Sequence, residues 1–432
     1  MLNIVLIAID TLRADHLSCY GYPVKTSPTL DRIASDGVVF EECIAPGIPT
    51  HPGYTTIFTG MHPLTHQIVC HGGNLLLSWS IKTIPEMLYP KYFTAAVDNL
   101  VMTKGLWFIR GFEAYLYPGG ATVISRGAKV SGEAVTDKAI RFLRAWGDGR
   151  LGRKPLFLFI HYWDPHTPYL PPPGFREKFY RGGGTRLRPL LEETRWGRML
   201  LKTRWIQQLM SEGHDEKEYV DSLYDEEILY ADWCISRLVE ELERLDIYDE
   251  TLLIITADHG EGLGENKVYY DHHGLYEWDI RVPLIMRCPR MLPKGRRIRG
   301  IVTHEDIAPT MLDAAGIAPP YRMDGVSLLP IIEGKAEARS FTICVENTRM
   351  SKRAIRTREW KLIETLRPDV YGNPAGHLEL YSLKRGENEN LAEDKQDTVG
   401  ELMMLMEKWY RQKLSGRPDP LAVQPISLPI PE

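Results

Sequence analysis

The sequence is poor in cysteine, in long apolar runs and in net charge. Its 432 residues include only six cysteines, none in a CxxC pair, which argues against a disulfide scaffold and favours free thiols. No stretch approaches the ~18–20 apolar residues that cross a membrane, so we expect no membrane span. The net charge of −5 balances 52 Lys+Arg against 57 Asp+Glu. Such a balance excludes the basic field that concentrates nucleic acid, so an anionic ligand has to be attracted locally.

The first residues lack the features of a targeting segment. MLNIVLIAIDTLRADH has no basic leader and no small-residue cleavage site, and its apolar run before Asp10 is short. We therefore interpret residues 3–9 as a first strand and expect a cytoplasmic protein. The length allows two or three domains, or one large core of α/β type.

Short apolar runs alternate with helical patterns along most of the chain. The predicted strands are 3–9, 92–97, 155–162, 251–257 and 282–288. They are apolar on both faces, which is typical of a buried, mostly parallel sheet. The predicted helices are 28–35, 131–146 and 217–245. This alternation predicts one doubly wound α/β domain.

Two segments depart from this alternation. Residues 174–215 are Arg-rich and weakly periodic, and we interpret them as an insertion over one sheet edge, with a solvated face favoured over a binding lid. After residue 335 we expect three short strands, a helix near 397–414 and an extended, Pro-rich tail. The predicted domains are therefore 1–335, which carries the insertion, and 336–432.

Polar side chains directly follow two of the predicted strands. Asp10 comes after the first strand, and Asp258-His259-Gly260 follows the strand 251–257. An Asp at a strand end is by itself more often a turn former than a metal ligand. Because ligands of open α/β sheets bind at the carboxyl ends of the strands, the two carboxylates and the imidazole together favour a divalent-ion site.

Thr50 stands about where the N-cap of a helix belongs, because Pro52 suits a first helical turn and Gly60 follows the apparent helix. Its hydroxyl would lie among unpaired helix N–H groups, which favour an anion or an alkoxide. On this segment alone, an ordinary capping Thr is the favoured interpretation.

Histidines gather near other strand ends. HYWDPHTPY supplies His161, Asp164 and His166, and His272 and His273 precede the strand 282–288. A single His is more often structural than a ligand. Five histidines, counting His259, at one edge of one sheet are harder to explain that way, and they indicate a site.

These segments occur in an order that resembles the sulfatase branch of the alkaline phosphatase superfamily over nearly the whole chain. The matching stretches are NIVLIAIDTLRADHLSCYGY, PTLDRIASDGVVFEECIA, the TxP…TG segment 50–60, DPHTPY, TADHGEGLGE, LYEWDIRVPLIMRCP, HEDIAPTMLDAAGI, DGVSLLP, REWKLIE and LYSLKRGENENLAE. The resemblance implies an α/β/α sandwich with a small C-terminal antiparallel-sheet subdomain. It also implies hydrolysis of sulfate or phosphate esters at a metal-bound nucleophile, which makes 1–335 the catalytic domain.

The resemblance assigns roles to individual residues. It implies that Asp10, Asp258 and His259 are metal ligands and that Thr50 is the nucleophile and a further ligand. His166 corresponds to the histidine that serves the substrate oxyanion or the leaving group.

The remaining site candidates also come from the resemblance. His272 stands near a Lys that faces the transferred group in many sulfatases, with His273 as a one-residue alternative. Asn99 and Lys104 are the polar candidates for substrate binding where the family's GKWHLG segment is missing. Asp164 and His304 are the candidates for a second metal position.

The chain departs from the family at the nucleophile. Sulfatases carry C/S-x-P-S-R, whose Cys or Ser is oxidised to formylglycine, whereas Thr50 is a secondary alcohol that cannot form this aldehyde. Tyr54 replaces the motif's Arg, and Thr11 replaces the second Asp of the family's DD pair. We expect no formylglycine and one divalent ion, with Mn²⁺, Zn²⁺ or Mg²⁺ suiting the donors somewhat better than Ca²⁺.

The sequence therefore predicts a metal-dependent hydrolase of sulfuric or phosphoric esters, with phosphodiesters or phosphonate esters favoured. A Thr sulfate ester has no aldehyde to collapse to, whereas a metal-activated alkoxide attacks phosphorus well. The alternatives are a sulfuric ester hydrolase of arylsulfatase type, a di-metal phosphodiesterase, and an inactive homologue that binds anionic glycans through 174–205. The expected partner is a small anionic ester, with no nucleic acid and no membrane, and a homo-oligomer is left open.

Overall fold

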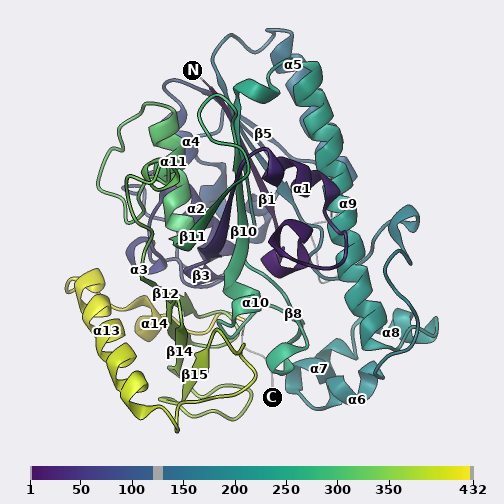
Figure 1. Cartoon of the computed structure of the whole chain (residues 1–432), viewed down its shortest axis with the longest axis vertical. Helices are drawn as coiled ribbons and strands as arrows, with labels where there is room; N and C mark the ends of the chain where they lie inside the picture. Colours follow the sequence, from purple (N-terminus) through teal and green to yellow (C-terminus); the bar gives the residue numbers. More distant parts are fainter. Residues whose placement is uncertain (1, 120–129, 429–432) are drawn as a thin grey trace.

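The computed structural model describes residues 2–119 and 130–428 (Figure 1). An eight-stranded sheet in the order β11-β2-β10-β7-β1-β6-β4-β5 forms its centre. The strands are β1 (Asn3–Ile9), β2 (Val38–Ile44), β4 (Phe93–Val97), β5 (Ala114–Leu116), β6 (Leu156–Tyr162), β7 (Thr251–Thr256), β10 (Arg281–Arg287) and β11 (Arg296–Thr303). Neighbours pair in parallel except β10, which is antiparallel to both β2 and β7.

The strands predicted from apolar runs are all present, within about one residue at each end. The side chains of β1, β6 and β7 are buried throughout, as expected for central strands covered on both faces. The expectation missed β2, β5 and β11. Charged residues interrupt the apolar pattern of β2, at Glu41 and Glu42, and of β11, which has several arginines, and β5 is only three residues long.

Helices cover both faces of this sheet, which confirms the predicted α/β/α sandwich (Figure 1). The helices α1 (Pro28–Ser35), α5 (Gly132–Gly147) and α9 (Lys217–Arg244) pack together over one face. The helices α2 (Thr50–Thr59), α4 (Ile84–Leu88) and α11 (Ile307–Ala314) pack together over the other. Shorter helices are α3 (Pro63–His66), α10 (Glu277–Ile280) and α12 (Leu329–Ile332).

A second sheet, with the order β15-β14-β13-β12-β3, lies beside the sandwich (Figure 1). Its strands are β3 (Gly47–Ile48), β12 (Phe341–Glu346), β13 (Lys352–Thr357), β14 (Trp360–Thr365) and β15 (Leu378–Ser382). The expected three C-terminal strands are four, because the segment AIRTREWKLIE turns back on itself as the β13–β14 hairpin. The fifth strand, β3, pairs in parallel with β12. The small sheet is thereby joined to the segment that leads into Thr50.

The C-terminal helix α13 (Gln396–Leu414) matches the predicted helix. The tail after it is not extended throughout, since α14 (Pro420–Val423) interrupts it. Asn347 holds the following residues by donating from Nδ2 to the carbonyl of Pro425 at 3.0 Å. The end of the predicted tail, 429–432, lies outside the described residues.

The insertion 174–215 contains three short helices, α6 (Leu187–Glu192), α7 (Arg195–Leu200) and α8 (Arg204–Ser211). Thr194 and Thr203 cap α7 and α8 by accepting backbone hydrogen bonds. A two-stranded pair, β8 (Gly262–Leu263) and β9 (Tyr269–Asp271), follows β7. All six cysteines are free, as expected. Within the described part of the chain, no helix has the length and apolarity needed to span a bilayer.

Candidate active site

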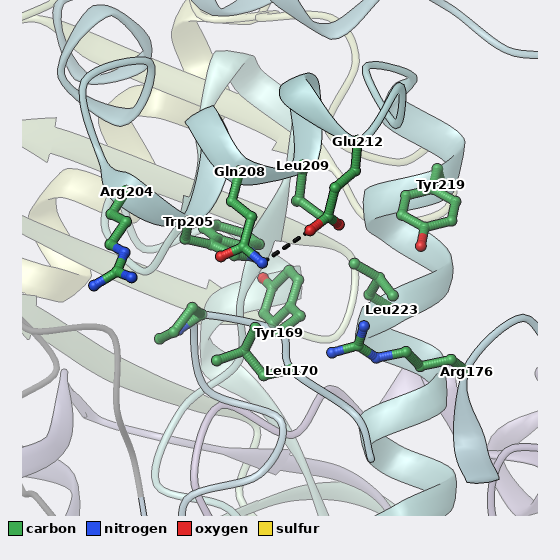
Figure 2. A pocket seen from close by; sticks show the side chains of 11 residues that line it. Tyr169, Leu170, Arg176, Arg204, Trp205, Gln208, Leu209, Glu212, Tyr219 and Leu223 are labelled. Atoms are coloured by element: carbon green, nitrogen blue, oxygen red, sulfur yellow. Dashed lines mark hydrogen bonds between the residues drawn. The ribbon is translucent and has the colours of Figure 1, made fainter. Parts of the chain in front are cut away.

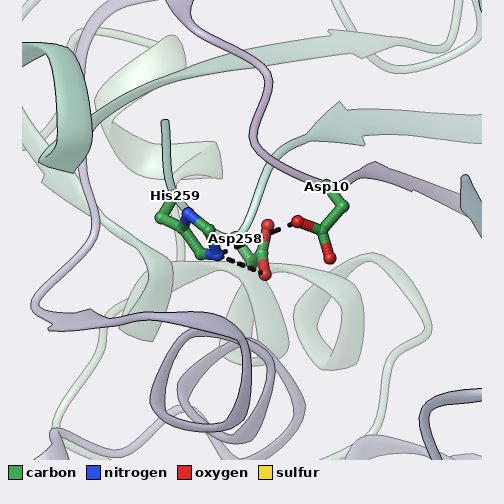
Figure 3. A group of neighbouring side chains, drawn as sticks. All are labelled: Asp10, Asp258 and His259. Atoms are coloured by element: carbon green, nitrogen blue, oxygen red, sulfur yellow. Dashed lines mark ion pairs between the residues drawn. The ribbon is translucent and has the colours of Figure 1, made fainter. Parts of the chain in front are cut away.

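Two adjacent strands, β1 and β7, bring three candidate ligands together at their carboxyl ends. Asp10 follows β1, and Asp258 and His259 follow β7 (Figure 3). One ligand atom from each residue lies within 4.8 Å of the others. His259 Nε2 is 3.3 Å from Asp258 Oδ2 and 3.8 Å from Asp10 Oδ1. Sequence reasoning anticipated this triad because parallel strands end at one edge of the sheet.

Three of the four carboxylate oxygens of the triad are buried without hydrogen-bond partners among the described residues. Both carboxylate oxygens of Asp10 and Oδ2 of Asp258 have no hydrogen-bond partner among the described residues. Burial, with the Asp10 carboxylate next in importance, raises the pKa of Asp258 well above its usual range. Two facing buried carboxylates are costly without a counter-charge. A divalent ion supplies that charge and accepts this O,O,N donor set, so the residues fit a metal ion.

Thr50 is placed within reach of the triad. It is the first residue of α2, it is buried, and its Oγ1 lies 3.5 Å from His259 Nε2. The predicted N-cap position is one residue off, because Pro49 precedes the helix there and no side-chain cap is formed. The Thr50 hydroxyl therefore lies beside the triad at the N-terminal end of α2.

A second histidine, His161, lies on the other side of Asp10. Its Nε2 is 3.5 Å from Asp10 Oδ2, and its Nδ1 is 2.8 Å from Asp98 Oδ1. Burial alone would lower the pKa of His161, but the two carboxylates outweigh it and raise the pKa to about 9. The Tyr54 ring packs 5.0 Å from the His161 ring, and its buried hydroxyl has no partner among the described residues. Sequence reasoning missed Asp98, since nothing in the sequence signals that β4 ends beside β6.

His166 and His272 form a pair beside the triad. Their ring centroids are 5.4 Å apart, and the His272 ring is 4.3 Å from that of His259. Burial would lower the pKa of His272, but the carboxylates of Glu261 and Asp271 outweigh it and raise the pKa to about 10. Burial lowers the pKa of His166. In this structure His272 is therefore the member of the pair that holds the proton.

The neighbouring His273 points elsewhere. Its Nδ1 lies 3.2 Å from Asp271 Oδ2, and its Nε2 lies 2.9 Å from Tyr371 Oη. Of the two histidines offered as alternatives, His272 is the one beside His259. The difference comes from a single step along the backbone, which turns adjacent side chains to opposite sides.

The other candidates are occupied or peripheral. Asn99 accepts a hydrogen bond from the Trp163 indole, and Lys104 is exposed. Asp164 accepts a hydrogen bond of 2.7 Å from the backbone N–H of Gly132 at the start of α5. His304 is buried near the carbonyl of Ala257. Across residues 2–119 and 130–428, the triad is the one group of three acidic, His or Cys side chains close enough to share an ion.

His71 is a site neighbour that sequence reasoning missed. Its ring stacks on His51 at 4.1 Å, and its backbone N–H donates to Thr348 Oγ1 at 2.9 Å. Burial lowers the pKa of His71, and His51, His272, Asp10 and His166 all lie near enough to act on it. Its position in a Gly-rich loop, far from any predicted strand end, carried no signal of this role.

Comparisons with known proteins bear on the family and the fold of the chain. The family model described as Sulfatase matches residues 2–317, and that of the N-sulphoglucosamine sulphohydrolase C-terminal region matches residues 264–413. An N-acetylglucosamine-6-O-sulfatase from Bacteroides thetaiotaomicron is 24% identical, over 96% of this chain and 88% of the relative.

Solved structures show the same fold. A complex with its substrate D-glucosamine-2-N,6-O-disulfate has a TM-score of 0.78 at 23% identity, over 97% of this chain and 99% of the other. A phosphonate monoester hydrolase from Agrobacterium radiobacter has a TM-score of 0.75 at 20% identity, over 96% of each chain.

Proposed function

This chain belongs to the sulfatase family, and from that premise we propose that it hydrolyses phosphodiesters or phosphonate monoesters in preference to sulfate esters, with Thr50 as nucleophile. Its relatives and structural neighbours include an N-acetylglucosamine-6-O-sulfatase, a complex with a glucosamine disulfate and a phosphonate monoester hydrolase, so hydrolysis of a sulfate or phosphonate ester is supported in general. The observation that carries the proposal is the position of the Thr50 hydroxyl, at the start of α2 and 3.5 Å from His259 Nε2. Thr50, which cannot become formylglycine, is therefore the residue that we propose attacks the ester.

Asp10, Asp258 and His259 would hold a divalent ion, which supplies Lewis acidity that lowers the pKa of the Thr50 hydroxyl. Thr50 Oγ1, its proton having been lost to solvent, attacks the phosphorus or sulfur atom, and the new bond forms as the bond to the leaving oxygen breaks. The free N–H groups of α2 face the negative charge that develops on the transferred group. The His166/His272 pair donates a proton to the leaving oxygen and accepts one from the water that then frees Thr50.

The preference for phosphorus follows from the missing aldehyde. A formylglycine hydrate releases sulfate by breaking its own C–O bond, whereas a Thr ester has to be opened by attack of water on the central atom. In-line displacement of this kind is the ordinary route of phosphoryl transfer. Tyr54 in place of the family's Arg also leaves one fixed positive charge fewer beside the nucleophile.

A second candidate is a sulfuric ester hydrolase that acts on an amino sugar. The alignment with the N-acetylglucosamine-6-O-sulfatase over 96% of this chain favours it. It would use the same residues, with direct hydrolysis of a Thr sulfate.

A substrate panel tests both candidates. p-Nitrophenyl sulfate, p-nitrophenyl phosphate, bis-p-nitrophenyl phosphate and p-nitrophenyl phenylphosphonate are each assayed with Mn²⁺, Zn²⁺, Mg²⁺ and Ca²⁺. Thr50→Ala is expected to lose at least about 10³-fold in kcat on the phosphorus esters while its metal content is unchanged. Thr50→Ser, which keeps a hydroxyl, is the matched control and is expected to stay active. Unchanged turnover in Thr50→Ala would remove Thr50 as nucleophile, and a higher kcat/KM for the sulfate ester would favour the second candidate.

A further inference from the structure

A pocket lies between the insertion and the body of the protein (Figure 2). Its volume is about 280 Å³, just below the ~300–1,000 Å³ typical of ligand pockets, which suits a single ring. The helix α8 contributes Trp205 and Gln208, the start of α9 contributes Tyr219 and Leu223, and Tyr169 comes from the segment after His166. The ester hydrolysis proposed above makes no use of this pocket.

The wall of the pocket contains both apolar surfaces and polar groups. The rings of Tyr169 and Trp205 meet edge to face at 5.3 Å, and Leu223 adds aliphatic surface. These side chains give the pocket a partly apolar wall.

Two arginines, Arg204 and Arg176, stand at opposite ends of the pocket (Figure 2). Arg176 donates from Nε to the carbonyl of Pro171 at 2.8 Å, and neither guanidinium forms an ion pair with a described residue. In the same insertion, Arg186 is paired with Asp215. Unpaired guanidinium groups at a partly apolar site are suited to bind a carboxylate, sulfate or phosphate.

The remaining polar lining suits hydroxyl groups. Gln208 donates from Nε2 to Glu212 Oε1 at 2.9 Å, and both side chains are exposed at the pocket (Figure 2). The amide and the carboxylate together offer donors and acceptors to a polyhydroxylated ring.

The pocket shares a wall with the candidate active site. Tyr169 follows His166 by three residues and packs against Tyr224 at 5.5 Å and Tyr270 at 5.7 Å. Tyr224 donates from its hydroxyl to the carbonyl of Thr11 at 2.7 Å, next to Asp10. Tyr169, which lines the pocket, is therefore connected through Tyr224 to the backbone next to Asp10.

We propose that this pocket binds an anionic sugar unit, as a second binding site beside the metal centre. The aromatic side chains pack against the faces of the sugar ring, Gln208 and Glu212 bind its hydroxyls, and one of the two arginines binds its negative group. The proposal goes beyond ester hydrolysis and holds for either ester. The sugar unit belongs either to the saccharide whose ester is cut or to a separate saccharide.

Binding is measured by calorimetry on the full chain, loaded with Mn²⁺ and carrying Thr50→Ala to prevent turnover. The probe is N-acetylglucosamine 6-sulfate, and the comparison ligands are N-acetylglucosamine and inorganic sulfate. We expect two sites per chain for the probe. Arg176→Ala with Arg204→Ala weakens one site at least about 10-fold, by loss of charge-assisted hydrogen bonds. Arg195→Ala with Arg198→Ala, an equal charge change in exposed residues of the same insertion, leaves both sites intact.

Several results would overturn the proposal. These are a single site per chain that Arg176→Ala with Arg204→Ala leaves unchanged, equal weakening by both double variants, or a second site that inorganic sulfate fills as tightly as the probe. Trp205→Ala, with its melting temperature checked, serves as a second variant and is expected to weaken the same site.

Initial rates separate this proposal from the proposed function. Wild type that hydrolyses none of the aryl esters while keeping the second binding site would contradict only the ester hydrolysis. A raised KM for a sulfated oligosaccharide in the Arg176→Ala, Arg204→Ala enzyme, with unchanged KM for an aryl ester, assigns the sugar unit to the substrate. An unchanged KM for both assigns it to a separate saccharide.

Discussion

At the scale of single residues, the site combines buried carboxylate oxygens that lack partners in the described part of the chain with a histidine close enough to share an ion. Asp232 shows the contrasting case of a buried carboxylate that accepts from the N–H groups of Thr29 and Leu30. Asp10 and Asp258 have buried carboxylate oxygens without such bonds among the described residues. Folding tolerates that arrangement where an ion completes it.

Metal binding should therefore stabilise the protein through Asp258. Adding Mn²⁺ or Zn²⁺ to chelator-treated protein is expected to raise the free energy of unfolding by about 4 kcal/mol at a metal concentration of 1,000 Kd. Asp258→Asn should abolish this rise. In the metal-free state the same variant should be no less stable than wild type, because it removes one of two facing carboxylates. Thermal melts and elemental analysis measure both effects.

Asp164→Asn is the matched control for this prediction. Asp164 bonds to the N–H of Gly132, so its amide variant should keep the metal-induced rise. Loss of the rise in Asp164→Asn, or its persistence in Asp258→Asn, would contradict the placement of the ion at the triad.

At the scale of elements, the site depends on how closely α2 approaches the loop after β7. Gly53 lies in the first turn of α2, and a Cβ there would come within 2.8 Å of the Asp258 carbonyl oxygen. This close approach of α2 to the loop after β7 places Thr50 beside His259. A different contact holds the start of α1, where Asp232 of α9 accepts from the N–H groups of Thr29 and Leu30, and Ser27 before the helix makes no cap bond. The starts of α2 and α1 are therefore fixed by contacts with other elements rather than by side-chain caps of their own.

Gly53→Ala should push α2 away from Asp258 and so weaken metal binding. We expect the Kd for the metal to rise at least about 10-fold, as it commonly does when groups that support metal ligands are changed. Gly400→Ala is the control, because Gly400 lies in helix α13 with nothing within 4 Å of the added Cβ. It should leave metal binding unchanged and stabilise the protein by about 0.5–1 kcal/mol. Competition with a chromogenic chelator measures the Kd, and equal Kd values for the two variants would contradict the close-approach argument.

At the scale of the whole molecule, buried histidines lie where the sandwich meets its C-terminal elements. His66 ends α3, which packs against α13. Its Nδ1 accepts from the N–H of Ile68 at 3.1 Å, and its Nε2 lies 3.1 Å from Thr56 Oγ1. Burial, assisted by the neighbouring His62, lowers the pKa of His66 to about 3. The folded protein therefore needs this imidazole neutral.

This requirement predicts a pH-dependent contribution to stability. Between pH 6.5 and 3 the unfolded chain binds a proton at His66 that the folded chain does not, so the stability that His66 contributes falls as the pH falls. Relative to His66→Gln, wild type should lose about 2 kcal/mol of unfolding free energy between pH 7 and pH 5. Urea unfolding of both proteins at each pH measures the difference. A difference that stays constant with pH would show that His66 is protonated in the folded state.

Much of the architecture followed from local patterns. Central strands buried on both faces produce continuous apolar runs, so β1, β4, β6, β7 and β10 were predictable, whereas β2 and β11 were hidden by their charged residues. Asp10, Asp258 and His259 were predictable as a group because each directly follows a central strand. The tail around α14 and the split of the β13–β14 hairpin depended on turns that composition alone did not reveal.

The sequence by itself predicted the sandwich, the grouping of Asp10, Asp258 and His259, and a Thr at the position of the family's Cys or Ser, because these depend on residue type and on order along the chain. The tertiary structure decided that His272 rather than His273 faces the triad. It also decided that Asp98 and His161 support Asp10 and that β3 joins the small sheet. These features depend on the directions of side chains and on contacts between residues far apart in the chain, and neither is encoded in a local pattern.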